Sequence, residues 1–406
     1  MTLPRYPSYK DSGVEWLGEV PGHWEVKRLK RNLALLTEKT DRRENPVALE
    51  NIESWTGRFI ATDTEFQGDG VAFDVGDILF GKLRPYLAKA YRAESSGEAV
   101  GDFHVMHPSA AIDGRFAQYQ ILNREFIAIV DGSTFGSKMP RASWEFVGGM
   151  KVTTPPLAEQ TQIATFLDRE TAKIDVLVAE QRRLMALLKE KRQAVISHAV
   201  TRGLNPDAPL KPSGNDWLGD VPAHWGICAL KHVVSMQSGE SITGENIYEV
   251  GEYQVFGGNG LRGYTSSFTH DGDFVLIGRQ GALCGNVNYA SGKFWASEHA
   301  VVATPKQRVN HVWLGEMLRA MNLNQYSVAA AQPGLSVDLI ERLGIALPSL
   351  DEQTQIAALL DRETVKLDTL TSEAQRAIDL LQERRTALIS AAVTGQIDVR
   401  SDVASY

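Results

Sequence analysis

Residues 157–164 read LAEQTQIA, and residues 350–357 read LDEQTQIA. The similarity continues without a gap to Thr201 and Thr394, and 27 of the 45 aligned residues are identical. A second phrase also recurs, because SGVEWLGEVPGHW at 12–24 returns as SGNDWLGDVPAHW at 213–225. The stretches between these phrases share little sequence. The pattern indicates two variable modules held by duplicated connectors.

The duplicated segments 157–201 and 350–394 predict two long helices. Neither contains Gly or Pro, and both are rich in strong helix formers. Their apolar residues follow one another at steps of four, seven and three, which is typical of a coiled-coil seam. The predicted seam consists of Ile163, Leu167, Ile174, Leu177, Leu184, Leu188 and Val195, and of Ile356, Leu360, Leu367, Leu370, Ala377, Leu381 and Leu388.

An exposed seam of this length needs a partner. Either each helix packs on its own module, or the two helices pack on each other in antiparallel orientation. The order of the repeats favours the second arrangement, because the first helix leads from one module to the other and the second helix must return.

The predicted fold is therefore α+β, with two mixed α/β modules joined by two long antiparallel coiled-coil helices in a pseudo-twofold repeat. The predicted parts are an N-terminal segment and first module at 1–156, a central helix at 157–201, a linker and second module at 202–349, a C-terminal helix at 350–395, and a tail at 396–406.

Composition excludes several classes of protein. With 43% hydrophobic and 23% charged residues the 406-residue chain is neither disordered nor collagenous, and no apolar run approaches the roughly 20 residues of a membrane span. Cys228 and Cys284 are too few for a disulfide framework, so we expect a cytoplasmic protein. We find no phosphate-binding loop, nucleophile elbow, dinucleotide fingerprint or metal-ligand set, which indicates a recognition protein rather than a catalyst.

Both modules contain an apolar strand that ends in a cation. GDILFGK at 76–82 and GDFVLIGR at 272–279 place Lys82 and Arg279 in matching positions, 197 residues apart. Arg, Lys and Gln contact base edges and phosphates, and aromatic rings stack or wedge. We therefore predict DNA contacts from Lys82, Arg84, Tyr86, Lys89, Arg279, Gln280 and Lys293. We also predict contacts from Lys138 and Arg141, which lie in the loop before a helix start predicted at Ser143. The alternative is an ordinary solvated surface.

Two further features recur in matching positions. Ser143 and Ser336 lie 193 residues apart and predict helix N-caps. His23 and His224 recur beside Trp24 and Trp225, and we attribute this recurrence to packing.

The WLGxVPxHW phrases, the run GDILFGKLRPYL at 76–87 and the EQxxIA helix starts resemble the specificity subunit of type I restriction–modification systems. The resemblance covers nearly the whole chain. It implies two target recognition domains that each read one half of a bipartite, asymmetric DNA site, and an antiparallel coiled coil that fixes their spacing. It also implies two methyltransferase (modification) subunits docked around this frame, and restriction subunits in the full complex.

The same resemblance implies a subunit without catalysis and without a cofactor, since S-adenosylmethionine, ATP and Mg²⁺ would be held by the partner subunits. Two other functions remain open: an enzyme in its own right, and a coiled-coil protein-binding scaffold without DNA readout. The net charge of -8 opposes phosphate binding, so we expect weak DNA binding by the chain alone and a basic channel completed by partners.

Overall fold

The computed structural model describes residues 4–40, 45–62, 69–136, 138–281, 284–327 and 334–400. The chain forms two compact units: unit 1 comprises residues 1–181 and 376–406, and unit 2 comprises residues 182–375. Helices α4 (Leu157–Arg202) and α7 (Leu350–Val393) each begin in one unit and end in the other. The two predicted long helices are therefore present, and each unit holds the start of one and the end of the other.

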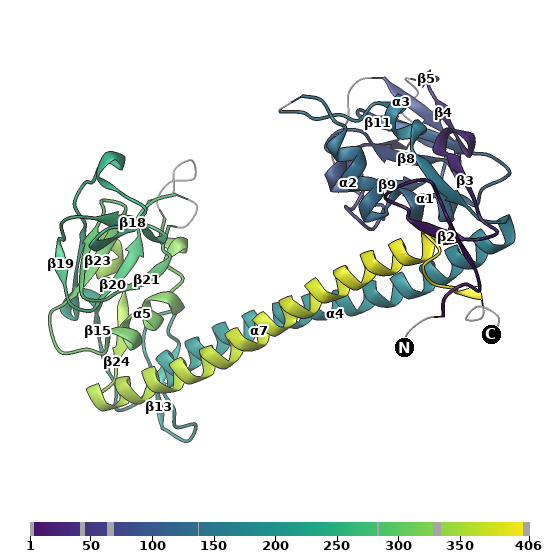
Figure 1. The fold of residues 1–406 in the computed structure, drawn as a ribbon. Coiled ribbons are helices and arrows are strands. Elements are labelled where there is room, and N and C mark those ends of the chain that lie inside the picture. Colours follow the sequence, from purple (N-terminus) through teal and green to yellow (C-terminus); the bar gives the residue numbers. More distant parts are fainter. Residues whose placement is uncertain are drawn as a thin grey trace. The chain divides into compact units, whose positions relative to one another are not determined.

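Unit 1 contains two four-stranded sheets (Figure 1). The first has the order β4 (Leu33–Leu36), β11 (Phe103–Pro108), β8 (Ile78–Gly81), β9 (Ala90–Arg92). The second has the order β5 (Lys39–Thr40), β7 (Gly70–Phe73), β10 (Gly97–Val100), β6 (Pro46–Val47), with only β10 and β6 parallel. The helices of this unit are α1 (Gly114–Ile121), α2 (Arg124–Gly132) and α3 (Trp144–Gly149), together with the 3-10 turns η1 (Leu29–Arg31), η2 (Leu49–Asn51) and η3 (Pro85–Leu87).

Strand β8 is buried on both faces, as its continuous apolar sequence predicts. Ile78 and Phe80 pack into a core shared with α1, α2 and the long helices, whereas Leu79 packs against the second sheet. Unit 1 is therefore a three-layer arrangement of helices, sheet and sheet, with β8 in the middle layer.

Unit 2 repeats this arrangement. Its first sheet has the order β16 (Val234–Ser238), β23 (Ala300–Pro305), β20 (Phe274–Gly278), β21 (Val287–Ala290), and its second the order β18 (Gly260–Thr265), β17 (Tyr253–Gly257), β22 (Lys293–Ala296), β19 (His270–Asp271). Helices α5 (His311–Ala320) and α6 (Val337–Glu341) and the turns η4 (Leu230–His232), η5 (Gly244–Asn246) and η6 (Leu323–Tyr326) complete it. The central strand β20 is equivalent to β8.

The second sheets differ between the units. Strands β7, β10 and β6 correspond to β19, β22 and β17, because each set combines one antiparallel and one parallel pairing in the same order. The fourth strand is added at opposite edges: β5 pairs with β7, whereas β18 pairs with β17. The two units therefore share a frame and differ in the sheet edge that they complete.

Short antiparallel pairs form the connectors. They are β1 (Tyr9–Asp11) with β2 (Glu19–Pro21), β3 (Glu25–Arg28) with β12 (Lys151–Thr154), β13 (Leu210–Pro212) with β14 (Asp220–Pro222), and β15 (Gly226–Ala229) with β24 (Gly344–Leu347). Trp24 and Trp225 lie buried behind these pairs. The duplicated WLGxVPxHW phrase thus builds the same support in both units.

The recurring Glu-Gln pair joins each long helix to its unit. In unit 1 the Gln160 side chain accepts from the Asp113 N–H at 2.9 Å and donates to the Pro155 carbonyl at 2.8 Å. Gln353 makes the same two bonds in unit 2, with Asn310 at 2.9 Å and Pro348 at 3.0 Å. Since Asp113 and Asn310 are the N-caps of α1 and α5, each amide ties two helix starts together.

The preceding glutamates explain why the histidines recur. Glu159 bonds His23 at 2.8 Å, and Glu352 bonds His224 at 2.7 Å. The interpretation of the histidines as packing residues was incomplete. The rings do contact aromatic neighbours, with centroids 5.8 Å apart for His23 and Tyr6 and 6.4 Å apart for His224 and Trp225, but each side chain also holds the carboxylate of the following long helix.

Within each unit the two long helices run antiparallel. In unit 1, Ile163 at the start of α4 shares a core with Val393 at the end of α7; in unit 2, Ile356 at the start of α7 shares a core with Val200 at the end of α4. The helix ends thus pack on their units and on each other, so the two arrangements considered from the sequence are combined. No helix in the described ranges is both long enough and apolar enough to cross a membrane.

Three seam predictions were wrong. Leu177, Leu184 and Leu370 are 44%, 42% and 46% exposed, whereas Val178 and Ile378 are buried. The helices carry more apolar residues than one seam needs, and spacing alone selected some from the solvent-facing side.

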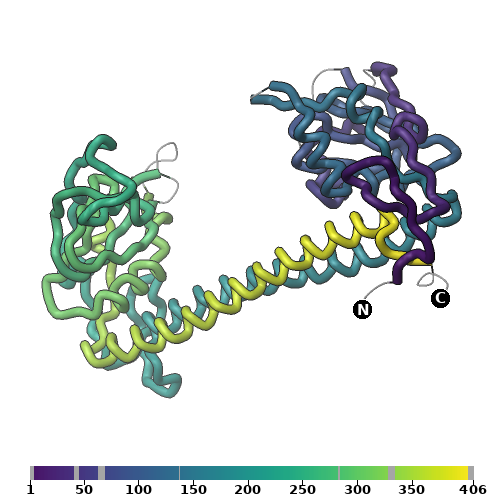
Figure 2. Tube along the Cα trace, viewed as in Figure 1, coloured from purple at the N-terminus to yellow at the C-terminus, as the bar shows by residue number. Residues whose placement is uncertain are grey.

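The end of the chain closes unit 1. In Figure 2 the purple N-terminal segment runs beside the yellow C-terminal one, and the Asp398 N–H donates to the Pro4 carbonyl at 2.8 Å. Gly395, with φ 78°, follows α7, and a Cβ there would lie 2.4 Å from Pro21. Glycine is required at this close approach. Val399 is buried in the unit 1 core, so the predicted tail is packed as far as that residue.

Candidate nucleic-acid interface

Lys82 and Arg279 occupy equivalent backbone positions. The Lys82 N–H donates to the Asp102 carbonyl at 2.8 Å, and its carbonyl accepts from Ala142 at 2.9 Å. The Arg279 N–H donates to the His299 carbonyl at 2.9 Å, and its carbonyl accepts from Leu335 at 3.0 Å. The sequence match between the two strand ends is thus also a structural match.

The same strand ends meet the same loop in both units. An isolated antiparallel β-bridge pairs the backbones of Leu83 and Arg141 in unit 1, and another pairs those of Gln280 and Gly334 in unit 2. The predicted residues Lys82 and Arg141 are therefore brought together, although 59 positions separate them in the sequence.

In unit 1 these two cations flank one carboxylate. Arg141 donates to Asp102 from Nε at 3.0 Å and from Nη2 at 2.8 Å, and the Lys82 Nζ lies 3.8 Å from Asp102 Oδ1. The hydrogen bonds from Arg141 hold the pKa of Asp102 below its usual value, against the opposing effect of partial burial. The Asp102 carboxylate stays ionised and orients both cations.

Arg84 and Lys138 lie beside this cluster. The Arg84 N–H donates to the Pro140 carbonyl at 2.8 Å, and Arg84 adopts the left-handed region with φ 50°. The side chains of Arg84 and Lys138 are exposed, and Tyr86 in the following turn is 47% exposed. Four predicted cations and one aromatic ring therefore lie on connected segments of unit 1.

Lys89 has a different environment. Its Nζ donates to the Leu49 carbonyl at 2.6 Å, and burial lowers the pKa of its ammonium. The contact ties the segment before β9 to η2. This bond gives Lys89 a structural role within unit 1, and we do not include it in the candidate interface.

In unit 2 the structure separates two of the predicted residues. Gln280 is exposed directly after Arg279, at the end of β20. Lys293 pairs with Asp271, which precedes β20, and its Nζ lies 4.7 Å from the centre of the Phe268 ring. Lys293 therefore belongs to the opposite end of that strand from Arg279.

Other polar residues surround the end of β20. The Gly278 N–H donates to the Asn286 carbonyl at 2.8 Å, and the Asn286 amide donates to Asn259 at 2.8 Å. The side chain of His299 is 45% exposed. Sequence reasoning did not select Asn259 or His299, although the turn signal GGNG at 257–260 marks the loop that carries Asn259.

The matched positions carry different chemistry. Asp102 in unit 1 corresponds to His299 in unit 2, and Arg141 corresponds to Gly334, because the members of each pair make the same backbone contacts. One unit thus presents two cations around a carboxylate, and the other presents a cation with amides and an imidazole. Among the described residues, no three His, Cys, Asp or Glu side chains gather as a metal site would require.

Comparison with known proteins bears on this arrangement. Residues 222–378 match the family model of the type I restriction modification DNA specificity domain. The chain resembles type I specificity subunits. The likeness inferred from the connector phrases is thereby confirmed.

Individual relatives agree. The type I restriction enzyme EcoprrI specificity subunit of Escherichia coli is 48% identical over 147 residues, which cover 35% of this chain and 36% of that relative. The chain thus matches only about a third of that relative's length. The MjaVIII specificity subunit of Methanocaldococcus jannaschii is 20% identical over 437 residues, covering 94% of this chain and 95% of the relative.

A solved structure shows the same fold. One chain of a type I R-M system aligns with a TM-score of 0.73 at 18% identity, covering 92% of this chain and 98% of that one. The predicted fold class, two mixed α/β units joined by two long helices, is confirmed.

Proposed function

We propose that this chain is the DNA sequence-specificity subunit of a type I restriction–modification complex, and that it performs no catalysis. Each unit reads one half of a bipartite, asymmetric DNA site. The observation that carries the proposal is the match of residues 222–378 to a DNA specificity domain, within a chain that repeats the frame of that domain.

The unlike strand ends support an asymmetric target. The backbone frame around Lys82 and Arg279 is the same, whereas the side chains that it presents differ at Asp102 and His299 and at Arg141 and Gly334. Base edges are distinguished by their pattern of donors and acceptors. Two frames with different donors should therefore select different bases.

The long helices support a fixed spacing. Asp175 and Arg192 stand 17 residues apart in α4, as do the repeat-related Asp368 and Arg385 in α7. Asp175 bonds Arg385 at 2.7 Å in unit 1, and Arg192 bonds Asp368 in unit 2. Because both helices continue unbroken from one unit into the other, we infer that their length sets the separation of the two half-sites.

Exposed leucines on these helices suggest where other subunits dock. Leu177 and Leu370 are equivalent in the repeat, as are Leu187 and Leu380, and the four are 44%, 46%, 51% and 57% exposed. Unit 1 holds Leu177 and Leu380, and unit 2 holds Leu370 and Leu187. Each unit thus presents an equivalent pair of apolar side chains, which fits two copies of one methyltransferase subunit.

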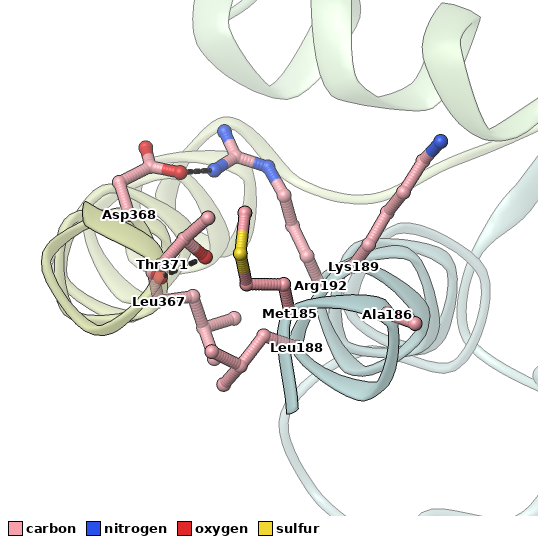
Figure 3. A pocket seen from close by; sticks show the side chains of 8 residues that line it. All are labelled: Met185, Ala186, Leu188, Lys189, Arg192, Leu367, Asp368 and Thr371. Carbon is pink, nitrogen blue, oxygen red and sulfur yellow. Dashed lines mark hydrogen bonds and ion pairs between the residues drawn. The ribbon is translucent and has the colours of Figure 1, made fainter. Parts of the chain in front are cut away.

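Unit 2 also has a groove between its two helix segments. It encloses about 370 Å³, and its lining includes Met185, Leu188 and Leu367 (Figure 3). Arg192 reaches across it to Asp368. An apolar floor with charges at the rim suits a helix of a partner protein.

The chemistry of the complex would belong to its other subunits. Methyltransferase subunits would bind S-adenosylmethionine, and restriction subunits would use ATP and Mg²⁺, so that this chain needs no cofactor. The net charge of -8 fits weak DNA binding by the chain alone, with partners completing a basic channel in the cytoplasm.

The test is to produce the chain together with its methyltransferase subunit in a host that lacks this system, and to map the methylated adenines. A split motif with two unlike halves supports the proposal. Exchanging residues 29–150 for the matching segment of another specificity subunit should change one half only. If the exchange leaves the methylated sequence unchanged, the protein-binding scaffold is the better explanation, and methyl transfer by the isolated chain would establish an enzyme.

A further inference from the structure

We propose that Arg141 reads a guanine in the half-site of unit 1, and that Asp102 holds its guanidinium in the reading orientation. The inference rests on the proposed function, because it names a base contact of the same DNA-binding surface. Asp102 is a positioning residue in this arrangement, and it was not among the candidates selected from the sequence.

The geometry leaves one edge of the guanidinium open. Asp102 accepts from Nε at 3.0 Å and from Nη2 at 2.8 Å, so that its two oxygens occupy the side edge of the planar group. The end edge, formed by Nη1 and the second N–H of Nη2, meets no acceptor among the described residues. The Arg141 side chain is 45% exposed. Two parallel donors therefore face solvent.

The backbone of Arg141 is also held. Its N–H donates to the Phe135 carbonyl at 3.2 Å, its carbonyl accepts from Phe135 at 3.4 Å, and it bridges to Leu83 beside the central strand. A side chain fixed at both ends loses little conformational freedom when it binds. The fork formed by the two parallel N–H donors of the Arg141 guanidinium is therefore pre-organised for a ligand of fixed shape.

Guanine fits this edge better than a phosphate does. Two parallel N–H donors of arginine match the O6 and N7 acceptors of guanine in the major groove. A phosphate would also accept from the fork, but the ionised Asp102 carboxylate lies next to it and repels a second anion. The neutral base edge carries no such penalty. Lys82, whose Nζ lies 3.8 Å from Asp102, remains available for a second contact in the same half-site.

Unit 2 lacks the pair. His299 and Gly334 stand where Asp102 and Arg141 stand in unit 1. A guanine contact of this kind is therefore expected in only one half-site, and the effect of removing it should be confined to that half.

The experiment uses the full chain assembled with its methyltransferase subunits, and measures the sequence preference of methylation at every position of the target. The variants are R141A, R141K and D102A. R141K retains the charge and removes the fork, which separates base reading from charge loss. R58A is the matched control, because Arg58 in the same unit forms an exposed ion pair with Glu53 at 2.9 Å. Melting temperature is recorded for each variant.

We expect R141A and R141K to reduce discrimination at one G·C pair by about 5- to 150-fold, in one half-site only. D102A should weaken discrimination at that same pair by a smaller factor, and R58A should leave the motif unchanged. The inference is overturned if R141K keeps full discrimination, if R141A weakens all sequences equally, or if the variants change only the melting temperature. A wild-type complex that methylates no split motif would instead refute the proposed function, and this inference with it.

Discussion

Replacing Asp175 with Ala should destabilise the end of α7 much more than the equivalent replacement of Asp368. Both residues are aspartates at matching positions of the repeat, and both bond an arginine of the opposite helix. They differ in burial. The Arg385 side chain is 8% exposed and Asp175 36%, whereas Arg192 is 33% and Asp368 64% exposed.

The magnitude follows from the arginine that is left behind. Arg385 donates from Nη1 to Asp175 at 2.7 Å, and its buried Nε has no acceptor among the described residues. A guanidinium stays charged in proteins, so D175A leaves a buried cation without its counter-ion. Breaking such a pair costs about 3–5 kcal/mol, and the partial exposure of Asp175 places this case near about 3 kcal/mol. For D368A the loss should be about 0.2–1 kcal/mol, as for exposed pairs.

Native-state hydrogen exchange measures both losses locally. A loss of about 3 kcal/mol should speed amide exchange in residues 376–393 by roughly 100-fold or more, since about 1.4 kcal/mol corresponds to a factor of ten. D368A should speed exchange in residues 350–375 by less than about tenfold. Equal effects of the two variants, or a larger effect of D368A, would refute the assignment of the difference to burial.

Three more outcomes are expected. K82A should alter methylation preference or strength at one half-site, whereas K89M should lower the melting temperature of the complex without changing the motif; a shared effect at both half-sites would contradict this. Deleting residues 177–183 together with 377–383 removes one heptad from each helix and should change the tolerated spacer, and an assembled variant with unchanged spacing would argue against the helices as its determinant. Burial lowers the pKa of His104 to about 4, so between about pH 6.5 and 4 the unfolded chain binds a proton that the folded chain does not, and stability decreases as the pH is lowered through that window. H104Q should flatten the pH dependence of the melting temperature relative to wild type.

The repeat made much of the fold predictable. Duplication with an unbroken helical pattern implied two long helices, and the return of the chain implied that they run antiparallel. The central strands β8 and β20 could also be predicted from the sequence, because strands that are buried on both faces are continuous apolar runs. Ser143 caps α3 as predicted, accepting from the Phe146 N–H at 3.3 Å, whereas Ser336 starts α6 without such a side-chain bond.

Contacts between distant residues could not be predicted in the same way. His23 and Glu159 are separated by 136 positions, and a recurring histidine beside a tryptophan suggests packing as readily as a carboxylate partner. The nine candidate contacts were chosen by residue type and by their place after a matched strand or in the loop before a matched helix start. Tertiary structure then distinguished Arg141, whose guanidinium pairs with Asp102 along one edge and is 45% exposed, from Lys89, whose ammonium is bound to a carbonyl. The edge strand β5 also depends on pairing far along the chain, since Thr40 pairs with Gly70, whereas β18 forms a local hairpin with β17.

The placement of these features allows target choice to change without loss of the frame. Gln160 is buried and satisfies the N-cap residue of α1 and the Pro155 carbonyl, so its replacement would leave polar groups unsatisfied at about 1–3 kcal/mol each. Arg141 lies on an exposed loop, and its loss removes one surface ion pair. Changes at the strand ends are thus inexpensive for folding and consequential for base contacts. Changes in the connectors would instead destabilise the fold without altering base contacts. This difference explains why the duplicated phrases stayed alike while the surfaces between them diverged.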